Sequence, residues 1–184
     1  MSDLYRSAID ELAGAVSGID DAQVDEACRL VANARHICTY AGGREGLQLK
    51  GFAMRLFHLG RSVSVVGDMT VPALGEQDIF LVVCGPGEIS TSLALIGVAK
   101  AAGAKVVVVT AQPSGRVPAL ADHVLTIPAQ TMADDQGTNA SSVLPMGSLF
   151  EGALFVLFEV MVLKLKTLLG ESSETMRARH TNME

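Results

Sequence analysis

Two short glycine-rich segments are the places where this sequence could hold an anion. The first reads Ala41-Gly-Gly-Arg-Glu-Gly46, and the second reads Cys84-Gly-Pro-Gly-Glu-Ile-Ser90. Each follows an apolar run and precedes a helical pattern, so the N–H groups that open the next helix can face a negative charge. Neither is a P-loop or a dinucleotide-binding G-x-G-x-x-G. One such loop alone indicates a tight turn, whereas the pair favours a binding site.

A carboxylate, Glu151, stands close behind a long polar segment. Residues 129–147 are rich in turn formers, and connections of this length are typical of lids and binding loops. The segment leads into Ser148-Leu-Phe-Glu151, which has the spacing of a capping box. In that role Glu151 would only satisfy the first turn of a helix and would have a lowered pKa. From the residues alone, the capping role is the stronger prediction.

The elements around these residues predict a parallel sheet, because short β-branched runs alternate with helical patterns between about residues 36 and 128. We expect strands at residues 36–41, 62–66, 79–84, 105–110 and 123–127. We expect helices at residues 3–16, 21–34, 46–59, 88–102 and 148–169, followed by a short charged tail. If the strand order is 2-1-3-4-5, the first and third strands meet where ligands bind, and these two strands carry the glycine loops.

Length and composition favour one α/β domain with an aliphatic core. The chain has 184 residues, of which 49% are hydrophobic, and Trp is absent. The formal net charge of -6 leaves no basic footprint for nucleic acid or an anionic membrane. Within this domain we distinguish the amino-terminal helices (residues 1–35), the sheet core (36–128), a loop (129–147), and the carboxyl-terminal helix with its tail (148–184).

Cysteine usage and the apolar segments indicate a cytoplasmic protein without membrane contact. Cys28, Cys38 and Cys84 are too few for a disulfide framework and are predicted to be buried thiols in a reducing compartment. The amino-terminal sequence MSDLYRSAIDELAGAV does not have the pattern of a signal peptide. The longest apolar segment, Gly152 to Leu163, contains Glu159 and is too short to span a bilayer. No His/Cys/Asp group has the spacing of a metal site.

Several stretches carry a family resemblance: GGREGLQLKGFAMRLFHLG, VVGDMTVPAL, VVCGPGE, LPMGSLFEGALFVLFE and MRARHTNME. In order and spacing they resemble the sugar isomerase (SIS) domain family, most closely its 6-phospho-3-hexuloisomerase subgroup, from about Asp21 to Glu184. The resemblance implies a three-layer αβα, flavodoxin-like sheet and a homotetramer with its site shared between subunits. It also implies that a 3-hexulose 6-phosphate and fructose 6-phosphate are interconverted without metal or organic cofactor.

The same resemblance assigns roles to residues. Glu151 falls on the position of the base that moves a proton between adjacent carbons through an enediolate. His180, in the tail, falls on a histidine that reaches a site made with a neighbouring subunit, where it helps to open the sugar ring or shuttles protons. The implied substrate-binding positions are Gly43, Arg44, Glu45, Gly46, Cys84, Gly85, Gly87, Glu88, Ser90 and Thr91.

Four loop positions depart from the family, whose hydroxyl residues there bind the phosphate. Glu45 adds a negative charge, Cys84 is a weak donor, Pro86 removes an N–H and Ile89 offers no hydrogen bond. Three hypotheses therefore stay open. The chain is a 6-phospho-3-hexuloisomerase that holds phosphate by the remaining backbone donors and Arg44, an isomerase of a different or unphosphorylated sugar, or a non-catalytic sugar-binding or regulatory module.

Overall fold

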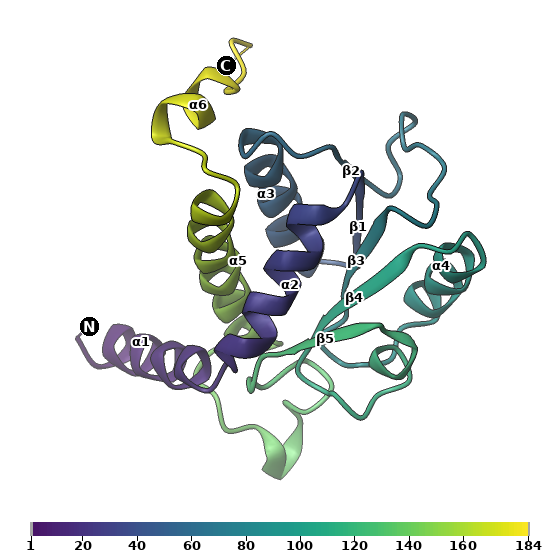
Figure 1. The fold of residues 1–184 in the computed structure, drawn as a ribbon. Helices are drawn as coiled ribbons and strands as arrows, with labels where there is room; N and C mark the ends of the chain where they lie inside the picture. The colour runs from purple at the N-terminus through teal and green to yellow at the C-terminus, as the bar shows by residue number, and fades with distance from the viewer. Residues whose placement is uncertain (1, 184) are drawn as a thin grey trace.

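The computed structural model describes residues 2–183 and contains one sheet of five parallel strands (Figure 1). The order is β2-β1-β3-β4-β5, which confirms the order expected for the family. All strand bounds fall within two residues of the predicted ones: β1 (Ile37–Ala41), β2 (Val63–Val65), β3 (Ile79–Val83), β4 (Lys105–Thr110) and β5 (His123–Thr126). β3 is buried along its whole length, as an apolar strand covered on both faces should be.

Helices cover both faces of the sheet and make the predicted three layers. On one face lie α2 (Asp21–Asn33), α3 (Glu45–His58) and α5 (Ser148–Leu168), with α1 (Ser2–Ser17) packed against α5. On the other face lies α4 (Ser90–Ala101) (Figure 1). The buried side chains accordingly form two clusters, one on each side of the sheet.

The long helix α5 packs against α1, α2 and α3, which explains why it is apolar over most of its circumference. Its Phe158 stacks on Phe52 of α3 with ring centroids 4.3 Å apart. Arg55 of α3 donates to both carboxylate oxygens of Glu159, at 3.1 and 3.2 Å. These contacts hold the two helices side by side, so the loops that precede them are held side by side as well.

The capping box expected at Ser148 is absent, and this prediction was wrong. Gly147, with φ of 79°, occupies the N-cap position, and Ser148 is the first residue of α5. Met146 also has a positive φ, of 55°, and two successive left-handed residues turn the chain sharply into the helix. Ser148 Oγ accepts a hydrogen bond from Arg44 instead of capping the helix. Glu151 is therefore not engaged as a capping residue.

Smaller differences concern helix ends. α4 begins at Ser90 rather than at residue 88. The short charged tail, for which no helix was predicted, contains a short helix, α6 (Ser173–Ala178), which Ser172 and Thr175 cap reciprocally. Short 3₁₀ turns, η1 (Pro118–Leu120) and η2 (Gly137–Asn139), complete the chain. No helix within residues 2–183 has the length and apolar character needed to cross a membrane.

Candidate functional site

A cavity of about 370 Å³ lies where the two glycine loops meet. The loops follow β1 and β3, which are neighbours in the sheet, so both open at its carboxyl edge. The remaining wall comes from the segment at residues 129–147 and from the start of α5. The lining residues are Gly42, Gly43, Arg44, Glu45, Pro86, Ile89, Thr131, Met132, Met146, Gly147, Phe150 and Glu151.

Glu151 and Arg44 form an ion pair in this cavity. Arg44 Nε lies 3.2 Å from Glu151 Oε1, and the Glu151 side chain is only 16% exposed. Arg44 also donates to Ser148 Oγ and to the Met146 carbonyl, so its guanidinium is held by three acceptors. Burial raises the pKa of Glu151, and the charge of Arg44 opposes that rise. The result is an oriented carboxylate with an increased affinity for a proton.

Glu45 crosses from the first loop to the second. The Gly85 N–H donates to both oxygens of the Glu45 carboxylate, with N–O distances of 3.1 and 3.3 Å. Burial raises the pKa of Glu45 to about 7, the hydrogen bond from Gly85 opposes the rise, and the negative charge of Glu151 adds to it. The cavity thus holds two carboxylates, of which one pairs with a cation and the other with a backbone donor.

The second loop meets the start of α4 at the cavity wall. Ile89 is the N-cap residue and makes no side-chain hydrogen bond, while Ser90 and Thr91 are exposed in the first turn. Neither Ser90 nor Thr91 is among the lining residues, but the turn that carries their hydroxyls and N–H groups directly follows Ile89, which lines the cavity. Glu88 is exposed and pairs with Arg116 at 2.9 Å, outside the lining of the cavity.

Two predicted residues of the second loop serve the framework. Cys84 is fully buried in the core beneath α4, and burial raises the pKa of its thiol to about 11, so it can contribute to a ligand only through its backbone. Gly87 has φ of +74°, and a Cβ there would lie 2.7 Å from Gln112 Cβ. Gly46, at the end of the first loop, is the second residue of α3 and lies outside the lining.

His180 lies at the other end of the molecule. Its ring stacks with that of His58, at 5.3 Å between centroids, beside a hollow between α3, α5 and α6 that Lys166 also lines. Lys166 follows Glu151 in α5 by fifteen residues, which is about 22 Å along the helix axis. Within one subunit, the structure does not bring His180 and Glu151 together.

The sequence did not identify the cavity residues contributed by the segment at 129–147. Its length marked the segment as functional, but nothing in the pattern singled out Thr131, Met132 or Met146. Two hydrogen bonds to other elements help to position this segment. Gln112 donates to Asp134 at 2.7 Å, and Glu11 of α1 accepts from the Val143 N–H at 2.9 Å.

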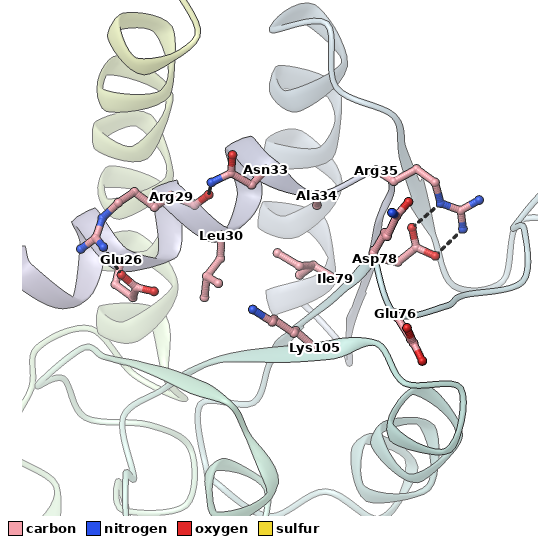
Figure 2. Close-up of a pocket in the computed structure, with 11 residues that line it drawn as sticks. Glu26, Arg29, Leu30, Asn33, Ala34, Arg35, Glu76, Asp78, Ile79 and Lys105 are labelled. Atoms are coloured by element: carbon pink, nitrogen blue, oxygen red, sulfur yellow. Dashed lines mark hydrogen bonds and ion pairs between the residues drawn. The ribbon is translucent and has the colours of Figure 1, made fainter.

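A larger hollow, of about 530 Å³, lies at the amino edge of the sheet (Figure 2). At one side of it, Arg35 Nε donates to Asp78 at 2.8 Å, and the Gly75 N–H donates to the same carboxylate at 2.7 Å. The hydrogen bond from Arg35 holds the pKa of Asp78 below its usual range. These contacts tie the start of β1 to the start of β3, and none of the predicted site residues lines this hollow.

The carboxyl-edge cavity is therefore the candidate site. It combines a buried carboxylate, a guanidinium beside it and backbone donors at two loop mouths, which suits proton transfer on a small polar ligand. Within residues 2–183, no group of three His, Cys, Asp or Glu side chains is placed to hold a metal ion.

Comparisons with known proteins identify the family of the chain. The SIS domain model matches residues 30–156. The "3-hexulose-6-phosphate isomerase" of Mycobacterium gastri is 36% identical over 95% of this chain and 87% of its own length. That of Bacillus subtilis is 31% identical over 96% and 95%. A crystal structure from Methanococcus jannaschii superposes with a TM-score of 0.83 at 22% identity, over 96% of this chain and 98% of that one. That structure is described as inferring a molecular function of 3-hexulose-6-phosphate isomerase.

Proposed function

This chain belongs to the SIS domain family, and we propose that it is a sugar-phosphate isomerase that moves a carbonyl between adjacent carbons, with a 3-hexulose 6-phosphate as substrate and fructose 6-phosphate as product. The observation that carries the proposal is the position of Glu151. Its carboxylate is buried in the cavity between the two loops, pairs with Arg44 and has no capping role.

Glu151 acts as the base in the proposed mechanism. Its carboxylate takes the proton from C-2, beside the C-3 carbonyl, and the electron pair of the broken C–H bond forms the C-2 to C-3 double bond of an enediolate. The Glu151 carboxyl, whose proton can exchange with solvent before it is returned, then gives a proton to C-3, while the oxygen-bound proton passes from the oxygen on C-2 to the oxygen on C-3. The carbonyl then stands at C-2, and no atom or electron has been gained or lost.

Arg44 stabilises the charge that develops on the two oxygens. Its guanidinium is already positioned by Glu151, Ser148 and the Met146 carbonyl, so little reorganisation is needed during the reaction. The N–H groups of the loop mouths, with the hydroxyls of Ser90 and Thr91, are the proposed donors to the phosphate. Gly43 and Gly46 contribute backbone only.

We further propose a homotetramer in which His180 reaches the site of a neighbouring subunit. Large apolar side chains exposed on the outer faces of α1, α3 and α5 support subunit contacts: Tyr5, Ile9, Leu47, Phe155 and Leu163 are each more than half exposed. Three free and buried cysteines support a reducing, cytoplasmic location.

The decisive experiment follows the proton rather than the product alone. The purified protein is incubated with fructose 6-phosphate in deuterated water, and deuterium uptake at the sugar carbons is measured by NMR. The wild-type protein should exchange the proton and form 3-hexulose 6-phosphate. Glu151→Gln should lower both rates by at least about 10³-fold, since the amide cannot accept the proton.

Glu26→Gln is the matched control, because Glu26 lies on α2 at the opposite edge of the sheet. It should leave exchange unchanged, and circular dichroism should show that both variants are folded. Equal rates of exchange and of product formation by Glu151→Gln and the wild-type protein would remove Glu151 as the base. Neither exchange nor formation of 3-hexulose 6-phosphate by the wild-type protein would remove the isomerase proposal.

A further inference from the structure

We propose that Glu45 is a specificity-determining residue. Its carboxylate occupies the anion-binding position of the second glycine loop, so that a sugar phosphate binds fully only when the Glu45 carboxyl is neutral. This inference rests on the proposed function and concerns the same cavity. It assigns a role to a position where the sequence departs from the family to which it belongs.

The geometry of Glu45 is that of a bound anion. Both of its oxygens face one backbone donor, the Gly85 N–H, at 3.1 and 3.3 Å. Gly85 allows this approach, because a Cβ at that position would lie 2.5 Å from Glu45 Oε1 and 3.0 Å from the Phe150 ring. The carboxylate is therefore packed tightly against the loop that would otherwise offer this N–H to a ligand.

A phosphate entering the loop competes with Glu45 for the donor and meets its charge. The charged residues that line the cavity are Arg44, Glu45 and Glu151, and Arg44 already pairs with Glu151. Beside Glu45, the neighbouring loop side chains are Cys84, Pro86 and Ile89, none of which is a cation. Two like charges in contact repel each other more strongly in a partly buried site, where the effective dielectric is lower than in water. An ionised Glu45 is thus poorly compatible with a phosphate at this loop.

Protonation removes the conflict within the physiological range. Burial raises the pKa of Glu45 to about 7, with a further contribution from the charge of Glu151. A neutral carboxyl can leave Gly85 without carrying a charge past the ligand, and it can donate its proton to a phosphate oxygen. Because a dianion stabilises the neutral form of Glu45, phosphosugar binding above pH 7 should take up a proton.

This proton requirement predicts how affinity changes with pH. When only the neutral form is competent, the apparent dissociation constant increases as the competent fraction falls, so it should rise about tenfold between pH 6 and pH 8. Over the same interval the phosphate itself becomes dianionic, with a second pKa near 6. A variant without the Glu45 carboxyl separates the two effects, since the ligand's ionisation is common to both proteins.

The test measures the affinity of fructose 6-phosphate by calorimetry from pH 6 to pH 8.5 for the wild-type protein, Glu45→Gln and Glu45→Ser. Parallel titrations in buffers of different ionisation enthalpy count the protons taken up. The wild-type dissociation constant should rise about tenfold relative to that of either variant across pH 6 to 8. Proton uptake near pH 8 should approach one in the wild-type protein and be lower in both variants.

Two controls complete the design. Glu26→Gln should keep the wild-type pH profile, and unphosphorylated fructose, if bound, should show no dependence on Glu45.

Identical pH profiles for the wild-type protein and Glu45→Gln would overturn the inference, as would an equal loss of affinity in both Glu45 variants at every pH. If the wild-type protein isomerises 3-hexulose 6-phosphate yet shows this result, only the role of Glu45 fails. If it neither binds nor isomerises any sugar phosphate, the proposed function fails with it.

Discussion

Arg44 has two roles in the proposed mechanism, because it is the cation beside the proposed base and it lines the cavity in which the sugar would bind. Its three acceptors are Glu151, Ser148 Oγ and the Met146 carbonyl. Burial raises the pKa of Glu151, and the charge of Arg44 makes the net rise smaller than burial alone would produce. The strength of the base is therefore set by a residue from another loop.

Replacing Arg44 by Gln should change the pH dependence of turnover as well as its rate. Without the guanidinium, the pKa of Glu151 rises further, so the acid limb of the kcat/KM profile should move to higher pH. The plateau value of kcat should fall by about a hundredfold, because a donor to the developing oxyanion is lost. Arg44→Lys keeps the charge and should show a smaller shift. An acid limb at the same pH in all three proteins would contradict the coupling of Arg44 to Glu151.

At the residue scale, the sequence could predict which side chains meet but not how they meet. Glu45 and Gly85 follow neighbouring strands, so their proximity follows from topology. The docking of both Glu45 oxygens on one N–H depends on a side-chain conformation and on the space left by Gly85, which no pattern encodes. Similarly, the Ser148 to Glu151 spacing fits a capping box, but two left-handed residues before Ser148 prevent that geometry.

At the scale of elements, the period of the apolar residues predicted every strand and the five main helices. The end of a helix depends on a few local hydrogen bonds, so α4, which Ile89 opens without a side-chain cap, begins two residues later than expected. α6 was missed because its six residues are too few to show a period. The first error concerns the cavity, because Ile89, which lines it, is an extended N-cap residue rather than part of the first helical turn.

The stack of Phe52 on Phe158 is the contact that aligns α3 and α5, and it can be tested by stability. Phe158 is 2% exposed, so Phe158→Ala should lower the free energy of unfolding by about 3–5 kcal/mol. Phe158→Leu keeps most of the apolar volume and should lower the free energy of unfolding by about 1 kcal/mol. That amount is the typical stabilisation by an aromatic pair beyond the burial of its surface. Urea denaturation followed by circular dichroism measures both. A loss for Phe158→Ala no larger than that of the surface variant Glu26→Gln would show that the stack is not structural.

On the scale of the whole molecule, the length of α5 separates the two proposed catalytic residues. Glu151 lies near its first turn, at the cavity, whereas His180 lies beside its last turns, about 22 Å away along the helix axis. The middle of α5 is fixed against α3 by the Phe52–Phe158 stack and the Arg55–Glu159 hydrogen bonds, and Arg179, beside His180, donates to the His58 carbonyl of α3. Within one subunit, these contacts hold His180 and Glu151 apart. A role for His180 in the reaction therefore requires a second subunit.

This requirement predicts complementation between inactive variants. Glu151→Gln lacks the proposed base but keeps His180, and His180→Ala lacks the histidine but keeps Glu151, so in the proposed homotetramer each variant alone should be strongly impaired. If His180 acts in the site of a neighbour, mixed tetramers contain some sites with both intact residues. The two variants are co-expressed with different tags, purified in tandem and assayed. The mixed tetramers should recover up to about a quarter of the wild-type rate. In random mixtures about half of the sites keep Glu151, and half of those receive an intact His180. Light scattering would confirm that the variants assemble. Activity of the mixture equal to the mean of the two parents would place any role of His180 within its own subunit, contrary to the separation along α5.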